Sequence, residues 1–402
     1  MVRLRWNAIG LAIALIGCTK RNPNVCCETD AECMAVGYDS PQPCELGVCV
    51  ANACEEVGCD GDEDCPEMTP RCGANVCESI ASTCESAGGR VVYVSNRDGD
   101  DDLIVANADG YGAHPITTTI ANERDPRWSP DGRRVAFTRD GLGGGRDLFV
   151  ANVDGTGAVN LTSSSSRETF AEWSGDSVNL AFETEAPPYK AAWLVNATSG
   201  APRQIDTMST DSAHPSWGPD SARYAFSAKA AVGEPARLIV ILIDGTGRNP
   251  FSVAAAGQGD LHPRWSPDGA KIAFTSDRGG AGALWIVDAN GTNPVQLVAD
   301  VPIDSTPAWA PDSLRIAFVR QQGPQRNVWS VKRDGSDERN LTQHDSFNDR
   351  PRWSPNGLYL LFNSTRDGNS EVYRMRNDGT ETRNLSSDPA TDSDADWIGC
   401  GN

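Results

Sequence analysis

The residues best suited to chemistry stand at fixed distances before seven tryptophans that recur along the chain. Five positions before each tryptophan, in what we call the minus-five row, the side chains are mostly acidic: Glu123, Glu168, Ser212, Asp260, Asp304, Asn348 and Asp392. Three positions before it, the minus-three row contains Asp125, Phe170, His214, His262, Thr306, Arg350 and Asp394. Imidazole and carboxylate groups are good ligands for divalent cations, so an acidic ring beside two histidines could hold a metal ion.

A second interpretation gives both rows a structural role, in which polar side chains cap strand ends and hydrogen-bond to neighbouring loops without any ligand. We favour this interpretation for the metal question and predict no resident cofactor, with a divalent cation at His214 and His262 as the alternative. All members of the two rows except Ser212, Phe170 and Thr306 are our candidate binding residues.

The search for a catalytic motif is negative. The sequence contains no G-x-S-x-G, H-E-x-x-H or P-loop pattern. Its four histidines are His114, His214, His262 and His344, and no spacing connects any of them to a serine and an aspartate. We therefore predict no catalytic residue.

The charge of the chain excludes one class of partner. The formal net charge is −20, and a phosphate backbone is bound by neutralising it with lysine and arginine. Nucleic acid is therefore not an expected partner.

The N-terminus has the layout of an export signal. Arg3 and Arg5 precede an apolar run over residues 8–16 that is too short to span a bilayer. The run ends in "LIGC", which resembles the lipobox of bacterial lipoproteins, so we expect residues 1–17 to be removed and Cys18 to carry lipid. Thr19 follows, which in the enterobacterial pattern implies the outer membrane. The alternative is an ordinary cleaved signal followed by an incidental cysteine.

The next segment, residues 18–89, is predicted to be an acidic disulfide scaffold and tether. Eleven cysteines fall between positions 26 and 84, in two units that share C-x5-C and C-x4-C spacings. In a cytosolic protein such spacing would suggest zinc, but after an export signal it favours disulfides. The segment has almost no large apolar side chains, so crosslinks must hold it together.

The elements that position the two rows come from a repeat. "PRWSPDG" occurs at 126–132 and again at 263–269, and the seven tryptophans, 128, 173, 217, 265, 309, 353 and 397, are 44 to 48 residues apart. Each unit contains four strand-like pieces, for example 125–130, 134–140, 147–155 and 158–164. A period in the forties with several short strands indicates a β-propeller blade.

The repeat x-P-x-W-S-P-D-G-(R/K)-x-(I/V)-A-F-T-S-D-R resembles the WD-like propeller repeat of the TolB-like family and of prolyl oligopeptidase relatives. The resemblance covers residues 90–397 and implies an all-β, seven-bladed propeller of four-stranded antiparallel blades over residues 90–402, preceded by the small disulfide-rich segment. It supports the fold more strongly than the function.

The strand count predicts how the ring closes. The array begins with a second strand and ends with an inner strand, so the C-terminal strand must join the first blade. Cys84 and Cys400 then become neighbours, and because twelve cysteines remain once Cys18 is lipidated, we predict a Cys84–Cys400 disulfide. The variable loops should lie at the opposite end from the chain termini, where they can form a binding face.

Two functions follow from these patterns. The first is a lipid-anchored protein of the bacterial cell envelope, which we expect at the outer membrane, on its periplasmic side or at the cell surface. Its propeller binds a protein or a cell-wall ligand without catalysis. The alternative is a metal-dependent, lyase-like propeller enzyme acting on an acidic saccharide at the central channel.

Overall fold

The computed structural model describes residues 89–399, apart from 142, 187–188 and 252–258, together with four short strands nearer the N-terminus. The chain divides into two compact units, one of residues 1–87 with 111–113 and one containing the rest. Two small antiparallel hairpins lie in the first unit, formed by β1 (Cys44–Glu45) with β2 (Val48–Cys49) and β3 (Arg71–Gly73) with β4 (Val76–Glu78). Cys18, Cys84 and Cys400 lie outside the described residues, so the lipid anchor and the disulfide stay predictions.

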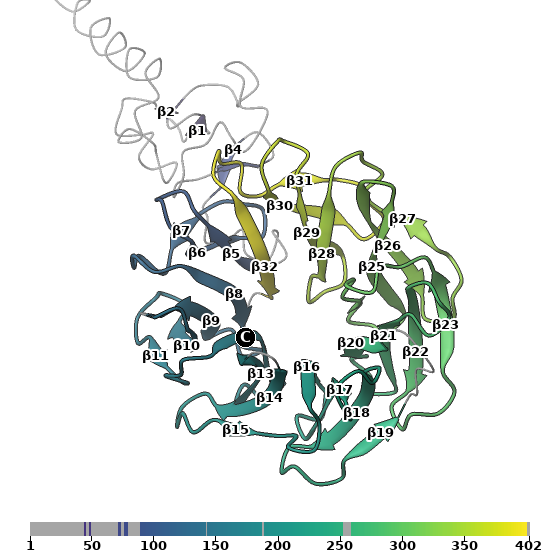
Figure 1. Ribbon diagram of the computed structural model, residues 1–402. Coiled ribbons are helices and arrows are strands. Elements are labelled where there is room, and N and C mark those ends of the chain that lie inside the picture. Colours follow the sequence, from purple (N-terminus) through teal and green to yellow (C-terminus); the bar gives the residue numbers. More distant parts are fainter. Residues whose placement is uncertain are drawn as a thin grey trace, which may run out of the picture. The chain divides into compact units, whose positions relative to one another are not determined.

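The second unit is a ring of seven four-stranded antiparallel blades around a central axis (Figure 1), and one parallel pairing, Arg146 with Arg167, joins the second and third blades. The first blade contains β32 (Asp392–Ile398), β5 (Arg90–Ser95), β6 (Asp102–Asn107) and β7 (His114–Pro115). Blades two to four are β8 (Glu123–Trp128), β9 (Arg134–Asp140), β10 (Arg146–Asn152) and β11 (Val159–Asn160); β12 (Arg167–Trp173), β13 (Asn179–Ala186), β14 (Tyr189–Asn196) and β15 (Arg203–Gln204); and β16 (Asp211–Trp217), β17 (Arg223–Lys229), β18 (Arg237–Leu242) and β19 (Asn249–Phe251). Blades five to seven are β20 (Asp260–Trp265), β21 (Lys271–Ser276), β22 (Ala283–Asp288) and β23 (Val295–Ala299); β24 (Ala308–Trp309), β25 (Arg315–Gln322), β26 (Gln325–Lys332) and β27 (Arg339–Asn340); and β28 (Asn348–Trp353), β29 (Tyr359–Ser364), β30 (Glu371–Arg376) and β31 (Arg383–Asn384). The predicted all-β, seven-bladed architecture is confirmed.

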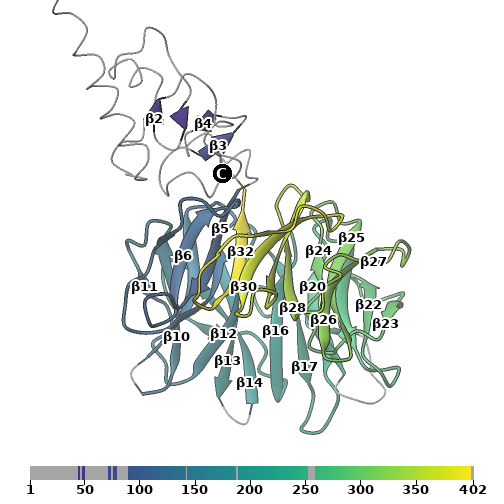
Figure 2. The same cartoon turned by 90° about the horizontal axis from the view of Figure 1, so that it is seen from above.

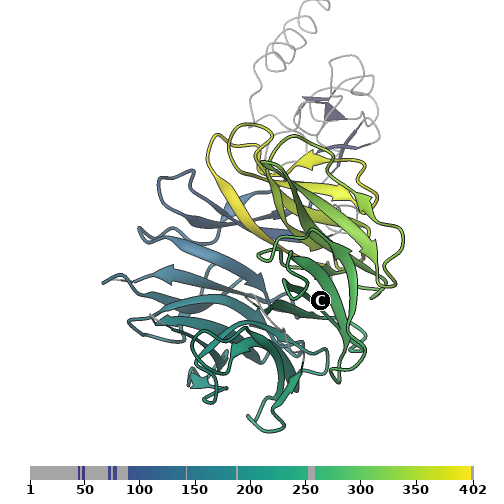
Figure 3. The same cartoon turned by 45° about the vertical axis from the view of Figure 1, so that its right-hand side comes forward.

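The repeated tryptophan holds neighbouring blades together. Trp128, for example, is 5% exposed and packs among Val92 and Val105 of the preceding blade. Four of the indole N–H groups donate to a backbone carbonyl of the blade before, as in Trp173 Nε1 to Arg127 O at 3.1 Å and Trp309 Nε1 to Arg264 O at 3.0 Å. Figure 3, in which the blades are seen obliquely, shows the twist that lets successive sheets stack in this way.

The ring closes as the strand count predicts. β32 pairs antiparallel with β5, and Ile398 stands opposite Arg90, so the last strand of the chain is the inner strand of the first blade. The two strands lie side by side in Figures 1 and 2. Closure therefore protects the inner edge of a sheet that would otherwise be left open.

The Pro-Asp-Gly turns end the inner strands for a local reason. The Ser129 hydroxyl donates to Asp131 Oδ1 at 2.6 Å, and Gly132 adopts a φ of 69°, which glycine reaches without strain. The turn is also bound to the next blade, because the Asp131 backbone N–H donates to Ser177 Oγ at 3.0 Å. These short turns and those after each third strand lie at one end of the propeller, and the longer, variable loops lie at the other. In the part of the chain that the structure describes, there is no helix long and apolar enough to cross a membrane.

Candidate functional site

A β-bulge in the inner strands shapes the wall of the central channel. In six of the seven blades the pairing with the second strand shifts register just before the tryptophan. The residue of the minus-three row lies in the bulge with a left-handed φ between 52° and 58°: Asp125, Phe170, His214, His262, Arg350 and Asp394. Thr306 is the exception, and a β-branched side chain is strongly disfavoured at positive φ. Since a bulge adds one residue to a strand, the alternation of side chains changes at this point.

The bulge places two rows of side chains on the channel. A cavity of about 710 Å³ is lined by most of the minus-three row and by residues one position before the tryptophans. We call the latter the minus-one row; those on the cavity wall are Arg127, Arg264, Ala308, Arg352 and Asp396. Sequence reasoning missed this row, although three of the repeats contain its arginine in the letters "PRWSP".

Most of the minus-five row is buried inside the blades. Glu123, Asp260 and Asn348 are 0% exposed, and each contacts an arginine of the adjacent second strand or the loop after it. Arg139 Nε donates to Glu123 Oε1 at 2.6 Å and Arg278 Nη2 to Asp260 Oδ1 at 2.6 Å, while Arg366 Nη2 donates to Asn348 Oδ1 at 3.3 Å.

The partner arginines are also held by aromatic rings. Arg139 stacks over Phe149 and Arg278 over Trp285, with Cζ to ring-centre distances of 4.6 and 4.7 Å. A buried carboxylate, its arginine and an aromatic ring therefore form a brace in the second and fifth blades, and in the seventh the Asn348 amide replaces the carboxylate while Arg366 stacks over Tyr373 at 4.6 Å. Asp304 is the exception in the minus-five row, because its side chain is 58% exposed and pairs with Arg326 at 2.7 Å.

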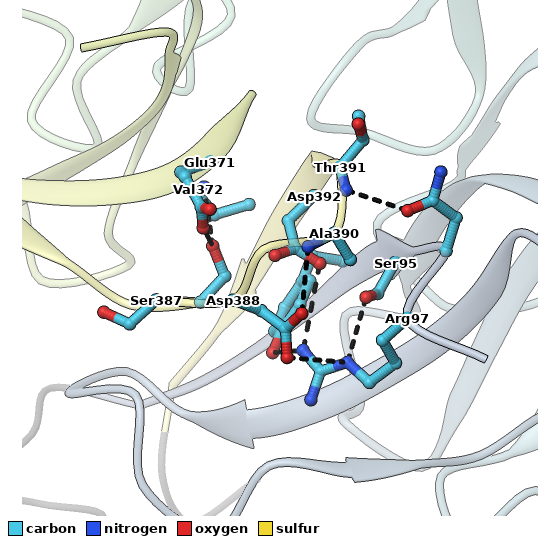
Figure 4. A network of polar contacts seen from close by, with 12 residues as sticks. Ser95, Arg97, Glu371, Val372, Ser387, Asp388, Ala390, Thr391 and Asp392 are labelled. Atoms are coloured by element: carbon cyan, nitrogen blue, oxygen red, sulfur yellow. Dashed lines mark hydrogen bonds and ion pairs between the residues drawn. The ribbon is translucent and has the colours of Figure 1, made fainter. Parts of the chain in front are cut away.

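The brace is looser in the blade that closes the ring (Figure 4). Asp392 is 0% exposed, but its nearest cation is Arg97 at 3.8 Å, and that guanidinium also approaches Asp388 at 4.0 Å. Burial raises the pKa of Asp392 to about 6. In the third blade burial raises the pKa of Glu168 to about 7, and the charge of Asp147 adds to the effect of burial. The Ser164 hydroxyl donates to Oε1 of Glu168 at 2.7 Å, and Oε2 is buried without a partner.

The two histidines of the minus-three row lie against each other. The ring centres of His214 and His262 are 3.9 Å apart, and Phe170 packs edge-on against His214 at 5.5 Å. Burial lowers the pKa of His262 to about 4 and holds that of His214 well below its usual value. Both rings are therefore neutral at pH 7.

The hydrogen bonds of the pair limit its use as a metal site. His262 Nδ1 lies 3.0 Å from the carbonyl oxygen of Ile303, which can only accept a hydrogen bond. Nδ1 therefore bears the proton of the neutral ring, and Nε2 is unprotonated. His214 Nδ1 is buried without a partner. The pair offers two nitrogen ligands, and no group of three or more His, Cys, Asp or Glu side chains suited to a metal occurs among the described residues. Two imidazoles fit part of a cation site but do not complete one.

The minus-one row brings three arginines together. The pKa of Arg352 is lowered to about 10, chiefly by the charge of Arg127, then by burial, with Arg264 adding to the effect. Glu172 binds Arg264 through Nη2 at 3.1 Å, and Asp396 Oδ2 accepts the backbone N–H of Trp128 at 2.9 Å. The minus-one row therefore brings three guanidinium groups onto one part of a cavity wall that also bears the carboxylates of Asp125, Asp304, Asp349, Asp394 and Asp396.

A closed ring of four-stranded antiparallel blades whose inner strands line a polar channel defines a β-propeller. The TolB beta propeller domain family matches residues 76–259 and 241–402, and the chain belongs to this family.

Individual relatives are distant. The Tol-Pal system protein TolB of Desulfosudis oleivorans is 31% identical over 78 residues, which are 19% of this chain and 18% of that protein. The crystal structure of TolB from Acinetobacter baumannii is similar with a TM-score of 0.51 and 18% identity, over 80% of this chain and 86% of that one. An oligogalacturonate lyase in complex with manganese has a TM-score of 0.61 and 16% identity, over 73% and 86% of the two chains. At these identities, the structural similarities show the fold alone.

Proposed function

We propose that the protein is a cell-envelope lipoprotein whose propeller binds a protein or a cell-wall ligand without catalysing a reaction. One observation carries the proposal: two carboxylates of the minus-five row that could act as acids or bases are enclosed in ion pairs within their own blades. Asp260 and Glu123 are buried against arginines, whereas a general acid or base has to reach its substrate. The name of the Desulfosudis relative, a Tol-Pal system protein, supports a role in an assembly.

Affinity capture tests this proposal directly. The full-length protein, expressed in its native host and crosslinked in intact envelopes, should retain a defined partner or cell-wall fragment. The matched control is a chain in which the loop at 230–236, between β17 and β18, is replaced by a short Gly-Ser linker, because this loop lies at the variable end of the fourth blade. Capture of the same material by a denatured chain would contradict specific binding.

The membrane anchor is tested with Cys18→Ser. We expect this variant to lose acylation and to leave the membrane fraction, since acyl chains provide durable anchoring. A Cys18→Ser chain that stays with membranes after a high-salt wash would refute the lipoprotein assignment.

A metal-dependent lyase is the second candidate, favoured by the contact between the His214 and His262 rings and by the manganese-bound lyase of similar fold. Elemental analysis of the purified protein, with polygalacturonate as a substrate, separates the two functions. We expect no stoichiometric metal and no depolymerisation. Bound manganese that disappears in a His214→Ala/His262→Ala double variant, together with cleavage of the polymer, would promote the enzyme.

A further inference from the structure

We propose that Arg127, Arg264 and Arg352 form a binding site for an oxyanion, a carboxylate or phosphate group, inside the propeller channel. The inference rests on the proposed function, because it names the chemical group by which a bound ligand would be held. It concerns the minus-one row and involves neither the histidines nor the carboxylates of the minus-five row.

The fold fixes where these arginines stand. They belong to the inner strands β8, β20 and β28 of three different blades, and all three line the same cavity. Trp173 and Trp309 of the following blades hold the backbone carbonyls of Arg127 and Arg264 through their indole N–H groups, at 3.1 and 3.0 Å. The backbone positions of the site are therefore set by the contacts that build the ring.

The guanidinium groups have more donors than the protein uses. No hydrogen bond or ion pair to any described residue involves the Arg352 side chain. Arg127 donates to the carbonyl of its neighbour Pro126 at 2.6 Å, and its Nε is buried without a partner. Arg264 is the best satisfied of the three, because it pairs with Glu172 and its Nη1 donates to the carbonyls of Pro263 at 3.0 Å and Pro215 at 3.4 Å. A buried donor without an acceptor costs free energy, which an incoming oxyanion would recover.

Charge favours the same ligand. The carboxylates whose charge acts on Arg352 are Asp396, which accepts a backbone N–H, and Glu172, which pairs with Arg264. Asp304 and Asp394 on the same cavity wall are ion-paired with Arg326 and Arg350. The lowered pKa of Arg352 reflects the repulsion from Arg127. An anion between the three would relieve this repulsion. The planar fork of a guanidinium matches the oxygens of a carboxylate or a phosphate, so either group suits the site.

Isothermal titration of the full chain tests the proposal with two probes, citrate for carboxylates and inorganic phosphate, in chloride buffer of constant ionic strength. We expect saturable, one-to-one binding of at least one probe, and the tighter probe identifies the source of the oxyanion. Arg352→Gln should weaken binding at least about tenfold, because a hydrogen bond to a charged group is lost. Arg352→Lys retains the charge without the fork and should fall between the two.

Arg339→Gln is the matched control, because Arg339 is exposed on the outer strand β27 and pairs with Asp337 at 2.7 Å. It should bind like the wild type. If Arg352→Gln does not fold, Arg127→Gln is examined in the same way. Failure of both probes to bind at millimolar concentration, or equal affinity in the arginine variants and the control, would overturn the proposal. Because the titration needs no envelope partner, its failure with successful capture refutes the oxyanion site alone, whereas binding of a probe without any capture refutes the proposed partner instead.

Discussion

The minus-five and minus-one rows lie on the same inner strands, four residues apart, and meet opposite conditions. In the minus-five row Asp260 and Glu123 are fully buried and each is paired with an arginine. In the minus-one row Arg127, Arg264 and Arg352 lie on the channel wall beside Asp396, and Arg352 has no ion pair within the described residues. The comparison indicates that the enclosed carboxylates of the minus-five row stabilise the blades through ion pairs. The arginines of the minus-one row face the channel, where a ligand could contact them.

The largest expected effect comes from removing a buried carboxylate. Asp260→Ala leaves Arg278 without its partner in an enclosed position, which should lower the free energy of unfolding by about 3 kcal/mol in urea denaturation. Asp304→Ala is the matched control from the same row, since its ion pair with Arg326 is exposed and should contribute less than about 1 kcal/mol. Equal losses in the two variants would end the distinction between enclosed and exposed members of the minus-five row.

Removing the charge of Glu168 should raise the free energy of unfolding instead of lowering it, because this carboxylate is buried without a cation. Its pKa in the folded protein is about 7, above the usual 4.5, so the folded state holds the proton more tightly than the unfolded state does. Stability from this group is present at low pH and is lost as the pH rises from about 4.5 through 7. Glu168→Gln should therefore be more stable than the wild type by about 2 kcal/mol at pH 8 and equal to it at pH 4.5. Glu381→Gln, at an exposed carboxylate paired with Arg376, is the control.

His262 should produce the reverse slope. Burial places its pKa in the folded protein at about 4, below the usual 6.5, so the unfolded state binds the proton more readily in between. The stability from this group is complete above pH 6.5 and is lost as the pH falls towards 4. Between pH 7 and pH 5 the wild type should lose about 1–2 kcal/mol that His262→Gln does not lose. Urea midpoints at the two pH values measure this, with the exposed His344→Gln as the control.

The smallest effect is expected in the minus-one row. Arg352→Gln removes one of three mutually repelling cations, so the propeller should be unchanged or more stable by about 0.5 kcal/mol at low salt. Added salt screens the repulsion and should remove the gain. A clear loss of stability at every salt concentration would show that Arg352 supports the fold rather than a ligand.

The blades and their closure could be predicted because the tryptophan spacing is a local, repeated signal. The spacing of Trp128, Trp265 and their counterparts predicts both the number of blades and the pairing of β32 with β5. The position of the minus-five row could not be predicted in the same way. Strict alternation along the strand puts positions minus five, minus three and minus one on one face, but the bulge at residues such as His262 breaks that alternation. Glu123 and Asp260 therefore point into the blade.

The arginines that pair with the minus-five row can be recognised in the sequence, because they recur at one place in the repeat. Arg139, Arg278 and Arg366 recur at the end of the second strand or in the loop after it, in "TRD", "SDR" and "STRD", near the point opposite the minus-five row. The recurrence of an arginine and an acid in the same unit indicates a pair. The contact between His214 and His262 was foreseeable as well, because the residues occupy the same position in adjacent blades, but their burial and neutral state depend on packing that no spacing reveals.

The pairing of β32 with β5 determines when the first blade can be completed during synthesis of the chain. A chain made from its N-terminus presents β5 about 300 residues before β32 exists, so the first blade must wait for the last strand. Throughout that interval the edge of β5 is open to any other strand, including one from a second copy of the chain. A ribosome that stops a few residues before Asp392 leaves six complete blades and one that can never be finished. Synthesis of β32 is therefore the step after which the edge of β5 can be paired within the chain, and the risk of aggregation through that edge ends there.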